Sequence, residues 1–176
     1  MENKTNIVIR QETAKDYPAV YALNLSAFGR KEEARLTDRL RLSDAFIPEL
    51  SLVATIENKI VGYILFTKIR IVNNADETQS LSLAPMAVLP EMQSEGIGSR
   101  LINYGLQKAR KLGYKSVIVL GHKEYYPKFG FVPTTKWCIK APFNIPADAF
   151  MGLELVEGGL EGVTGTVRYA KEFNNI

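Results

Sequence analysis

The chain has 176 residues, of which 46% are hydrophobic and 23% charged, and its net charge is +3 at pH 7. This length and balance predict one globular domain over residues 1–176, with enough apolar residues to form a core. The small charge does not indicate a nucleic-acid partner, and no apolar run approaches the roughly 20 residues that cross a membrane. The single cysteine, Cys138, excludes an intrachain disulfide, and together with a single histidine it argues against a metal site. The start of the sequence is polar and unlike a signal peptide, so we expect a cytoplasmic protein.

The first part of the chain is expected to form a strand, two helices and a hairpin. Residues 5–10 are rich in β-branched side chains and predict a short strand. Apolar residues spaced three and four apart predict helices over 14–28 and 32–42. Residues 51–57 and 60–72 then predict the two arms of a hairpin.

Five basic residues gather around the second predicted helix: Arg30, Lys31, Arg35, Arg39 and Arg41. A solvated helix face is the simplest interpretation of this cluster. Attraction of an acidic partner is the alternative. RNA binding has little support, because no aromatic residues alternate with the charges.

The middle of the chain reads as strand, turn and helix. Residues 79–89 predict a strand, preceded by a polar loop over 73–78. Pro85 lies inside this strand and cannot donate a ladder hydrogen bond, so it predicts a β-bulge. A helix is expected to end near Leu112, and residues 115–120 predict a buried strand parallel to the first one. The remainder is rich in glycine and proline; it predicts a short helix over 124–129 and strands over 131–139 and 150–156.

The turn before the central helix has the spacing Q-x-x-G-x-G, from Gln93 to Gly98. Gly96 and Gly98 lack side chains, so a ligand can approach the backbone closely. The first N–H groups of a helix are unpaired, and the helix dipole places about half a positive charge there, which favours a pyrophosphate. The spacing is neither a dinucleotide motif, because Leu101 replaces the third glycine, nor a P-loop, because no Gly-Lys-Ser or Gly-Lys-Thr step occurs. From these six residues alone, an ordinary helix start is an equally good interpretation.

Two motifs in order resemble those of the GCN5-related N-acetyltransferases (GNAT family). The run AVLPEMQSEGIGSRLI, from Ala87 to Ile102, resembles motif A, and YPKFGF, from Tyr126 to Phe131, resembles the later Y-x-x-x-G-F motif. GHKEYYPKFGF and GVTGTVRYAKEF further resemble the YhbS-like branch of bacterial acetyltransferases. The resemblance implies an α/β (α+β) fold with a mixed, mostly antiparallel central sheet, splayed between two parallel strands and flanked by helices. It also implies an acetyl-CoA-binding unit over 81–112 and a variable C-terminal segment over 136–176.

The same resemblance implies acetyl-CoA as co-substrate and a primary amine of a small molecule or protein as acceptor, with direct transfer. The residues beside the pantetheine would be Met86, Ala87 and Val88. The pyrophosphate turn would be Gln93, Ser94, Glu95, Gly96, Ile97, Gly98 and Ser99. Arg100 either assists at the phosphates or is solvated. Val119 stands where many members have an asparagine that contacts the cofactor, which leaves the cofactor pose open.

Tyr126 is the implied general acid on the departing thiolate, because the pKa of free tyrosine is about 10 and that of a thiol about 8.5. Tyr125 is expected on another helix face and is the less favoured tyrosine. His122 and Glu33 are candidate bases, although a structural hydrogen-bonder and a surface carboxylate beside Arg30 are the simpler roles for them. Water relayed by the backbone is a third candidate. The alternative function is a catalytically quiet acyl-CoA-binding sensor or partner protein, and the chain could be a monomer or a homodimer.

Overall fold

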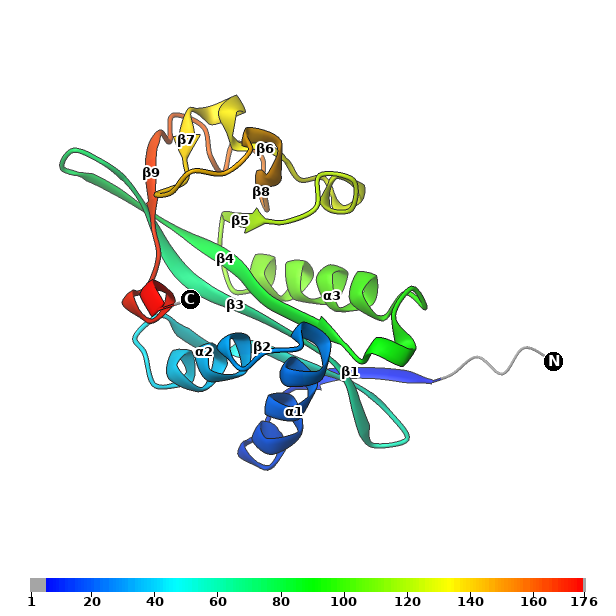
Figure 1. Cartoon of the computed structure of the whole chain (residues 1–176). Helices are drawn as coiled ribbons and strands as arrows, with labels where there is room; N and C mark the ends of the chain where they lie inside the picture. The colour runs from blue at the N-terminus through cyan, green and yellow to red at the C-terminus, as the bar shows by residue number, and fades with distance from the viewer. Residues whose placement is uncertain (1–5, 176) are drawn as a thin grey trace.

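A computed structural model describes residues 6–175, and its nine strands form one twisted sheet (Figure 1). The sheet order is β1-β2-β3-β4-β5-β8-β6, and β9 pairs with β3 and β7. The strands are β1 (Ile7–Gln11), β2 (Phe46–Ile56), β3 (Lys59–Asn73), β4 (Asp76–Val88), β5 (Ser116–Leu120), β6 (Val132–Pro133), β7 (Ile139–Lys140), β8 (Phe150–Glu154) and β9 (Gly165–Arg168). The pairs β4–β5 and β7–β9 are parallel and the other pairs are antiparallel. The mixed, mostly antiparallel sheet expected from the sequence is therefore confirmed.

Three α-helices and several 3-10 turns connect these strands. The α-helices are α1 (Tyr17–Phe28), α2 (Glu32–Arg41) and α3 (Ile97–Lys111), and the 3-10 turns are η1 (Ala14–Asp16), η2 (Pro90–Met92), η3 (Tyr126–Phe129), η4 (Thr134–Trp137), η5 (Ala147–Ala149) and η6 (Lys171–Asn175). Within residues 6–175, no helix combines the length and apolar character needed to cross a membrane.

The long β3–β4 hairpin corrects one prediction. The loop expected over 73–78 is wrong, because β3 runs to Asn73 and β4 resumes pairing at Asp76. The polar residues Glu77 and Thr78 are tolerated there because this end of the hairpin is exposed or half-buried. Polar composition therefore marked a solvated strand end, and the connection itself spans only 74–75.

The β-bulge predicted at Pro85 is confirmed. Met86 pairs with Ile64 and Leu83 pairs with Phe66, so Ala84 and Pro85 together oppose one residue of β3. On its other side β4 pairs with β5 only around Leu81 and Ser82. The edge of β4 from residue 84 to 88 thus lies free of β5, and the two parallel strands diverge toward their carboxyl ends (Figure 1).

Helices cover the two faces of the sheet differently. Leu101 and Leu106 of α3 pack with Phe66 and Leu81 on one face. On the opposite face, α1 and α2 cover Tyr63 and its neighbours. The C-terminal segment covers the rest of that face, where its apolar residues pack with Ile69, Ile71 and Ile118.

The strand expected over 131–139 is wrong. Pro133 lacks an N–H donor, and after two residues of β6 the chain turns through η4. Cys138 then adopts a left-handed conformation with φ of 57°, which ends any extended run. Strand β9, which was not predicted, pairs with β3 through residues 166–168.

Candidate active site

A cavity of about 2320 Å³ opens where β4 and β5 diverge. Its lining comes from β4, the turn before α3, the end of β5, η3, the start of α2 and the C-terminal segment. Pockets that hold one drug-sized ligand measure about 300–1,000 Å³, so this cavity has room for two reactants.

The glycine turn forms one end of this cavity. Gly96 precedes α3 with φ of +84°, a conformation that L side chains rarely adopt. The amide Nε2 of Gln93 donates to the carbonyl of Val88 at 3.2 Å, which ties the turn to the end of β4. Of the predicted turn residues, Gln93, Ser94, Gly96, Ile97, Gly98 and Ser99 line the cavity, whereas Glu95 and Arg100 do not. The result is a helix N-terminus that opens into a cavity, as an anion site requires.

The predicted strand residues lie along the free edge of β4. Met86, Ala87 and Val88 all line the cavity. Met86 and Val88 pack toward the α3 face, and Ala87 packs toward α1 and α2. Because no strand covers this edge on the β5 side, backbone polar groups are available to an amide-containing ligand.

Tyr126 lies at the other wall and is almost fully buried. Its ring packs so closely on Gly121 that a Cβ there would lie 2.2 Å from a ring carbon. Burial, with a smaller effect from Tyr125, raises the pKa of Tyr126 to about 12. The phenol lines the cavity, and its raised pKa keeps it protonated there near neutral pH.

Tyr125 lies beside the glycine turn. Its hydroxyl is 3.0 Å from the position that a Cβ on Gly98 would occupy. The ε-ammonium of Lys128 lies 4.9 Å from the centre of the Tyr125 ring, and both residues line the cavity. The prediction assumed an α-helix, but the segment is a 3-10 turn that begins after Tyr125, so Tyr125 and Tyr126 both reach the cavity.

The two candidate bases, His122 and Glu33, also line the cavity, but they differ in exposure and in hydrogen bonding. His122 is exposed, and its main-chain carbonyl accepts hydrogen bonds from the N–H groups of Tyr125 and Tyr126 at 3.0 and 3.3 Å. Glu33 is buried, and Arg30 Nε donates to both of its carboxylate oxygens at 3.0 and 3.1 Å. The expected pairing with Arg30 is present, but the expected surface position of Glu33 is wrong.

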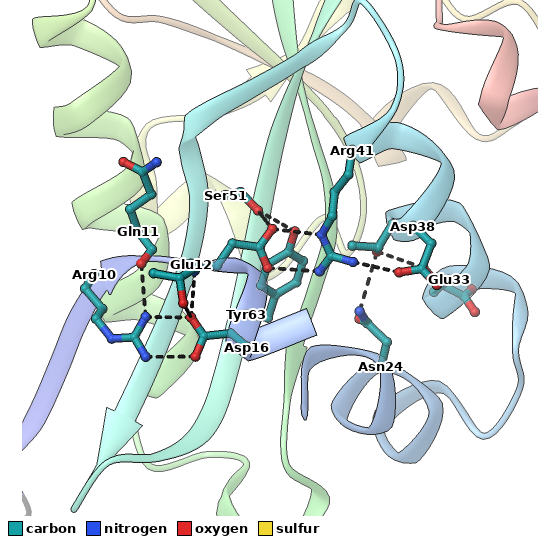
Figure 2. A network of polar contacts seen from close by, with 12 residues as sticks. Arg10, Gln11, Glu12, Asp16, Asn24, Glu33, Asp38, Arg41, Ser51 and Tyr63 are labelled. Carbon is teal, nitrogen blue, oxygen red and sulfur yellow. Dashed lines mark hydrogen bonds and ion pairs between the residues drawn. The ribbon is translucent and has the colours of Figure 1, made fainter. Parts of the chain in front are cut away.

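The basic cluster is the solvated helix face that the sequence suggested only in part, because Arg30, Lys31 and Arg35 are exposed but Arg41 is not. Arg41 turns inward, where it contacts Glu12 at 2.9 Å and Asp38 at 2.7 Å (Figure 2). Glu12 also bonds Ser51, whose hydroxyl lies 2.7 Å from that of Tyr63. This buried network joins the end of α2 to β2 and β3, so these charges serve packing.

The C-terminal segment contributes a feature that the sequence analysis missed. Phe143, Tyr169 and Phe173, which we call the aromatic wall, all line the cavity. The rings of Phe143 and Tyr169 are stacked, with centroids 6.1 Å apart, and those of Tyr169 and Phe173 are 5.2 Å apart. The only sequence signal was the presence of aromatic residues in a glycine- and proline-rich region.

Comparison with known proteins places this geometry in a family. Residues 14–131 match the model of the acetyltransferase (GNAT) family. The uncharacterized N-acetyltransferase YjhQ of Escherichia coli K12 is 42% identical over 123 residues, which are 69% of this chain and 68% of YjhQ. The uncharacterized N-acetyltransferase YhbS of the same strain is 32% identical over 169 residues, which cover 96% of this chain and 99% of YhbS.

Solved structures show the same architecture. The crystal structure of Escherichia coli YhbS in complex with CoA has a TM-score of 0.91 at 28% identity, and the match covers 100% of this chain and 96% of that one. A GNAT family acetyltransferase from Brucella melitensis in complex with acetyl-CoA has a TM-score of 0.78 at 28% identity, with coverage of 96% and 99%.

Proposed function

The chain belongs to the GNAT family of acetyltransferases, and we propose that it binds acetyl-CoA between β4 and β5 and transfers the acetyl group directly to a primary amine. The observation that carries this proposal is the divergence of β4 and β5 at the glycine-flanked start of α3. Both similar structures described above contain CoA or its acetyl ester, which supports the same ligand here.

The cofactor would use the backbone of this chain more than its side chains. The unpaired N–H groups at residues 96–99 and the dipole of α3 suit the pyrophosphate. The pantetheine amides would then pair with the free edge of β4 at Met86 to Val88, in the place of a neighbouring strand. This pose points the thioester toward Tyr126, on the opposite wall of the cavity.

Direct transfer needs a neutral amine, donors for the oxyanion and stabilisation of the departing thiolate. The amine nitrogen forms a bond to the acetyl carbon, the carbon–sulfur bond breaks, and the proton lost by nitrogen balances the charge of the thiolate. A proton moving from a phenol of pKa about 12 to a thiolate of pKa about 8.5 would go uphill by roughly 5 kcal/mol. Tyr126 would therefore act as a hydrogen-bond donor that stabilises the thiolate, while the thiol proton comes ultimately from the amine.

The amine proton leaves through His122, Glu33 or water. Glu33 already holds the guanidinium of Arg30, so this carboxylate is compensated by a neighbouring charge. His122 is exposed at the cavity, and histidine is the side chain that most often serves as a general base. We propose His122 as the more accessible of the two side chains.

Two measurements test the proposal on the purified protein. Calorimetry should detect binding of CoA and acetyl-CoA, and a thiol-release assay with a panel of amines should detect turnover. Tyr126→Phe should lower kcat by about 100-fold, since removal of one hydrogen-bond donor that stabilises developing negative charge typically costs about 10²–10³-fold, and should leave the Kd for acetyl-CoA unchanged. Tyr125→Phe is the matched control, with its main effect on Kd, because Tyr125 contacts the glycine turn.

If calorimetry detects no binding of CoA and none of acetyl-CoA, the proposal as a whole is contradicted. Heat without thiol release on any amine would favour the non-catalytic binding protein. Unchanged kcat in Tyr126→Phe would remove this residue from the mechanism and leave the binding site in place.

A further inference from the structure

The cavity has a second half, on the face of the sheet opposite α3. Side chains alternate along β5: Val117 and Val119 pack toward α3, while Ile118 packs on the opposite face. Leu120 therefore belongs to the opposite face, where it is 45% exposed at the cavity. If the cofactor enters from the start of α3, this face is the side from which an acceptor approaches the gap between β4 and β5.

Three exposed apolar side chains line this second half of the cavity. Phe28 is 39% exposed and Phe143 is 47% exposed, and both line the cavity together with Leu120. The three residues come from the end of α1, the end of β5 and the C-terminal segment. Single exposed apolar side chains are normal on a protein surface, but their convergence on one cavity indicates a binding surface.

Contacts with α1 and α2 hold the aromatic wall in place. Phe173 packs against the cluster of α1 and α2, and Arg39 Nη2 donates to the carbonyl of Glu172 at 3.3 Å. Tyr169 is half-buried between the other two rings. Phe143 is the most exposed ring of the wall at 47%, and within the described residues Tyr169 is its one aromatic neighbour, so part of the Phe143 ring is accessible to a planar group.

The charged residues that line the cavity further limit the class of amine that is expected to bind there. The cavity is lined by six Lys or Arg residues and three Asp or Glu residues. Such a lining disfavours a polycation, because like charges that meet in a site cost binding energy. Thr67 and Ser82 form a cross-strand pair on this face, and the Thr67 hydroxyl is buried without a hydrogen-bond partner among residues 6–175. Ser82 lines the cavity whereas Thr67 lies behind it, so the floor of this half offers the Ser82 hydroxyl.

Resting on the proposed acetyl transfer, we propose that the acceptor is a small primary monoamine that carries an aromatic ring. The ring stacks on Phe143, and the amine points into the gap between β4 and β5. The aromatic wall lies at residues 143–173, beyond the part of the chain that matches the family model, so this selectivity belongs to the C-terminal segment of this chain.

The test compares amines of similar basicity in the thiol-release assay with acetyl-CoA. We expect kcat/KM for 2-phenylethylamine to exceed that for hexylamine by at least tenfold, and spermidine to be the poorest substrate. Phe143→Leu keeps an apolar side chain at an exposed position, so the fold tolerates it. This variant should lower kcat/KM for 2-phenylethylamine about tenfold, with an unchanged Kd for acetyl-CoA by calorimetry.

A control variant is Leu42→Ala, because Leu42 is exposed but lies outside the cavity lining. It should change neither kcat/KM nor Kd. Equal or better use of hexylamine, of spermidine or of a lysine-containing peptide would overturn the inference while the proposed acetyl transfer stands. An unchanged preference among the amines in Phe143→Leu would also overturn the inference. The same holds if protein that binds acetyl-CoA releases no thiol in the presence of aromatic amines. Loss of cofactor binding in the parent protein would instead contradict the proposed function.

Discussion

Lys128 lines the cavity beside the proposed cofactor site. Its ammonium lies over the Tyr125 ring, and the Tyr125 hydroxyl lies over Gly98 at the start of α3. Within the described residues Lys128 makes no ion pair, so its charge is available to a ligand. The positive end of α3 and this ammonium therefore face the same part of the cavity.

We predict that Lys128→Ala weakens binding of CoA about five- to tenfold at low salt, which corresponds to roughly 1 kcal/mol. The effect should shrink as salt rises, because an exposed charge is screened over a Debye length of about 10 Å at 0.1 M. Calorimetry at two ionic strengths measures both quantities. Lys123→Ala is the control, since Lys123 pairs with Asp148 at 3.0 Å and lies outside the cavity lining. Equal effects of the two variants would refute the role of Lys128.

The tyrosine pair shows the limit of motif matching at this scale. The Y-x-x-x-G-F spacing identified Tyr126, and the structure brings this residue to the cavity. It did not identify Tyr125, because the helix-face argument used an α-helical period of 3.6 where the chain forms a 3-10 turn with about three residues per turn. Neighbouring side chains can then reach the same cavity.

At the scale of elements, α3 sits on the sheet with no spare room at Gly105. A Cβ added there would lie 2.3 Å from a ring carbon of Phe66, which is fully buried on β3. The glycine is thus required by the close approach of helix and sheet, although it costs about 0.5–1 kcal/mol in helix propensity relative to alanine.

We predict that Gly105→Ala destabilises the protein by about 1–3 kcal/mol, because overpacking a full core outweighs the better helix propensity of alanine. Denaturant unfolding followed by circular dichroism measures the change. Gln107→Ala, at an exposed position of the same helix, should stay within about 0.5 kcal/mol of the parent protein. A stabilised Gly105→Ala variant would show that Phe66 moves aside at little cost.

At the scale of the whole molecule, the structural features that could be predicted are those determined by residues close together in the sequence. The bulge at Pro85, the glycine turn and the parallel strand after α3 each follow from residues close together in sequence. The pairing of β9 with β3 joins residues about 95 apart, and the contact of Arg39 with Glu172 joins residues 133 apart. Short strands without regular alternation carry no local signal of such partners, so the half of the cavity opposite α3 could not be derived from the sequence pattern.

The C-terminal segment serves both the sheet and the cavity, and two truncations can separate these roles. A chain that ends after Arg168 keeps β9 but loses Tyr169 and Phe173. A chain that ends after Thr164 also loses β9, whose Val167 is 1% exposed and packs with Ile69 and Ile71.

We predict that the longer truncation product folds and binds CoA with a Kd within about twofold of the parent, because the glycine turn and the edge of β4 are untouched. Its stability should fall by about 1–3 kcal/mol through loss of the partly buried Phe173. The shorter product exposes Ile69 and Ile71 and loses the pairing of β9 with β3. Its free energy of unfolding should therefore fall by an amount that approaches the roughly 5–15 kcal/mol by which a whole domain is stable.

Thermal unfolding by circular dichroism measures the stability of the two truncation products, and calorimetry with CoA measures their binding. Equal melting temperatures would show that β9 adds nothing to the sheet, and a folded longer product that no longer binds CoA would show that the two halves of the cavity depend on each other.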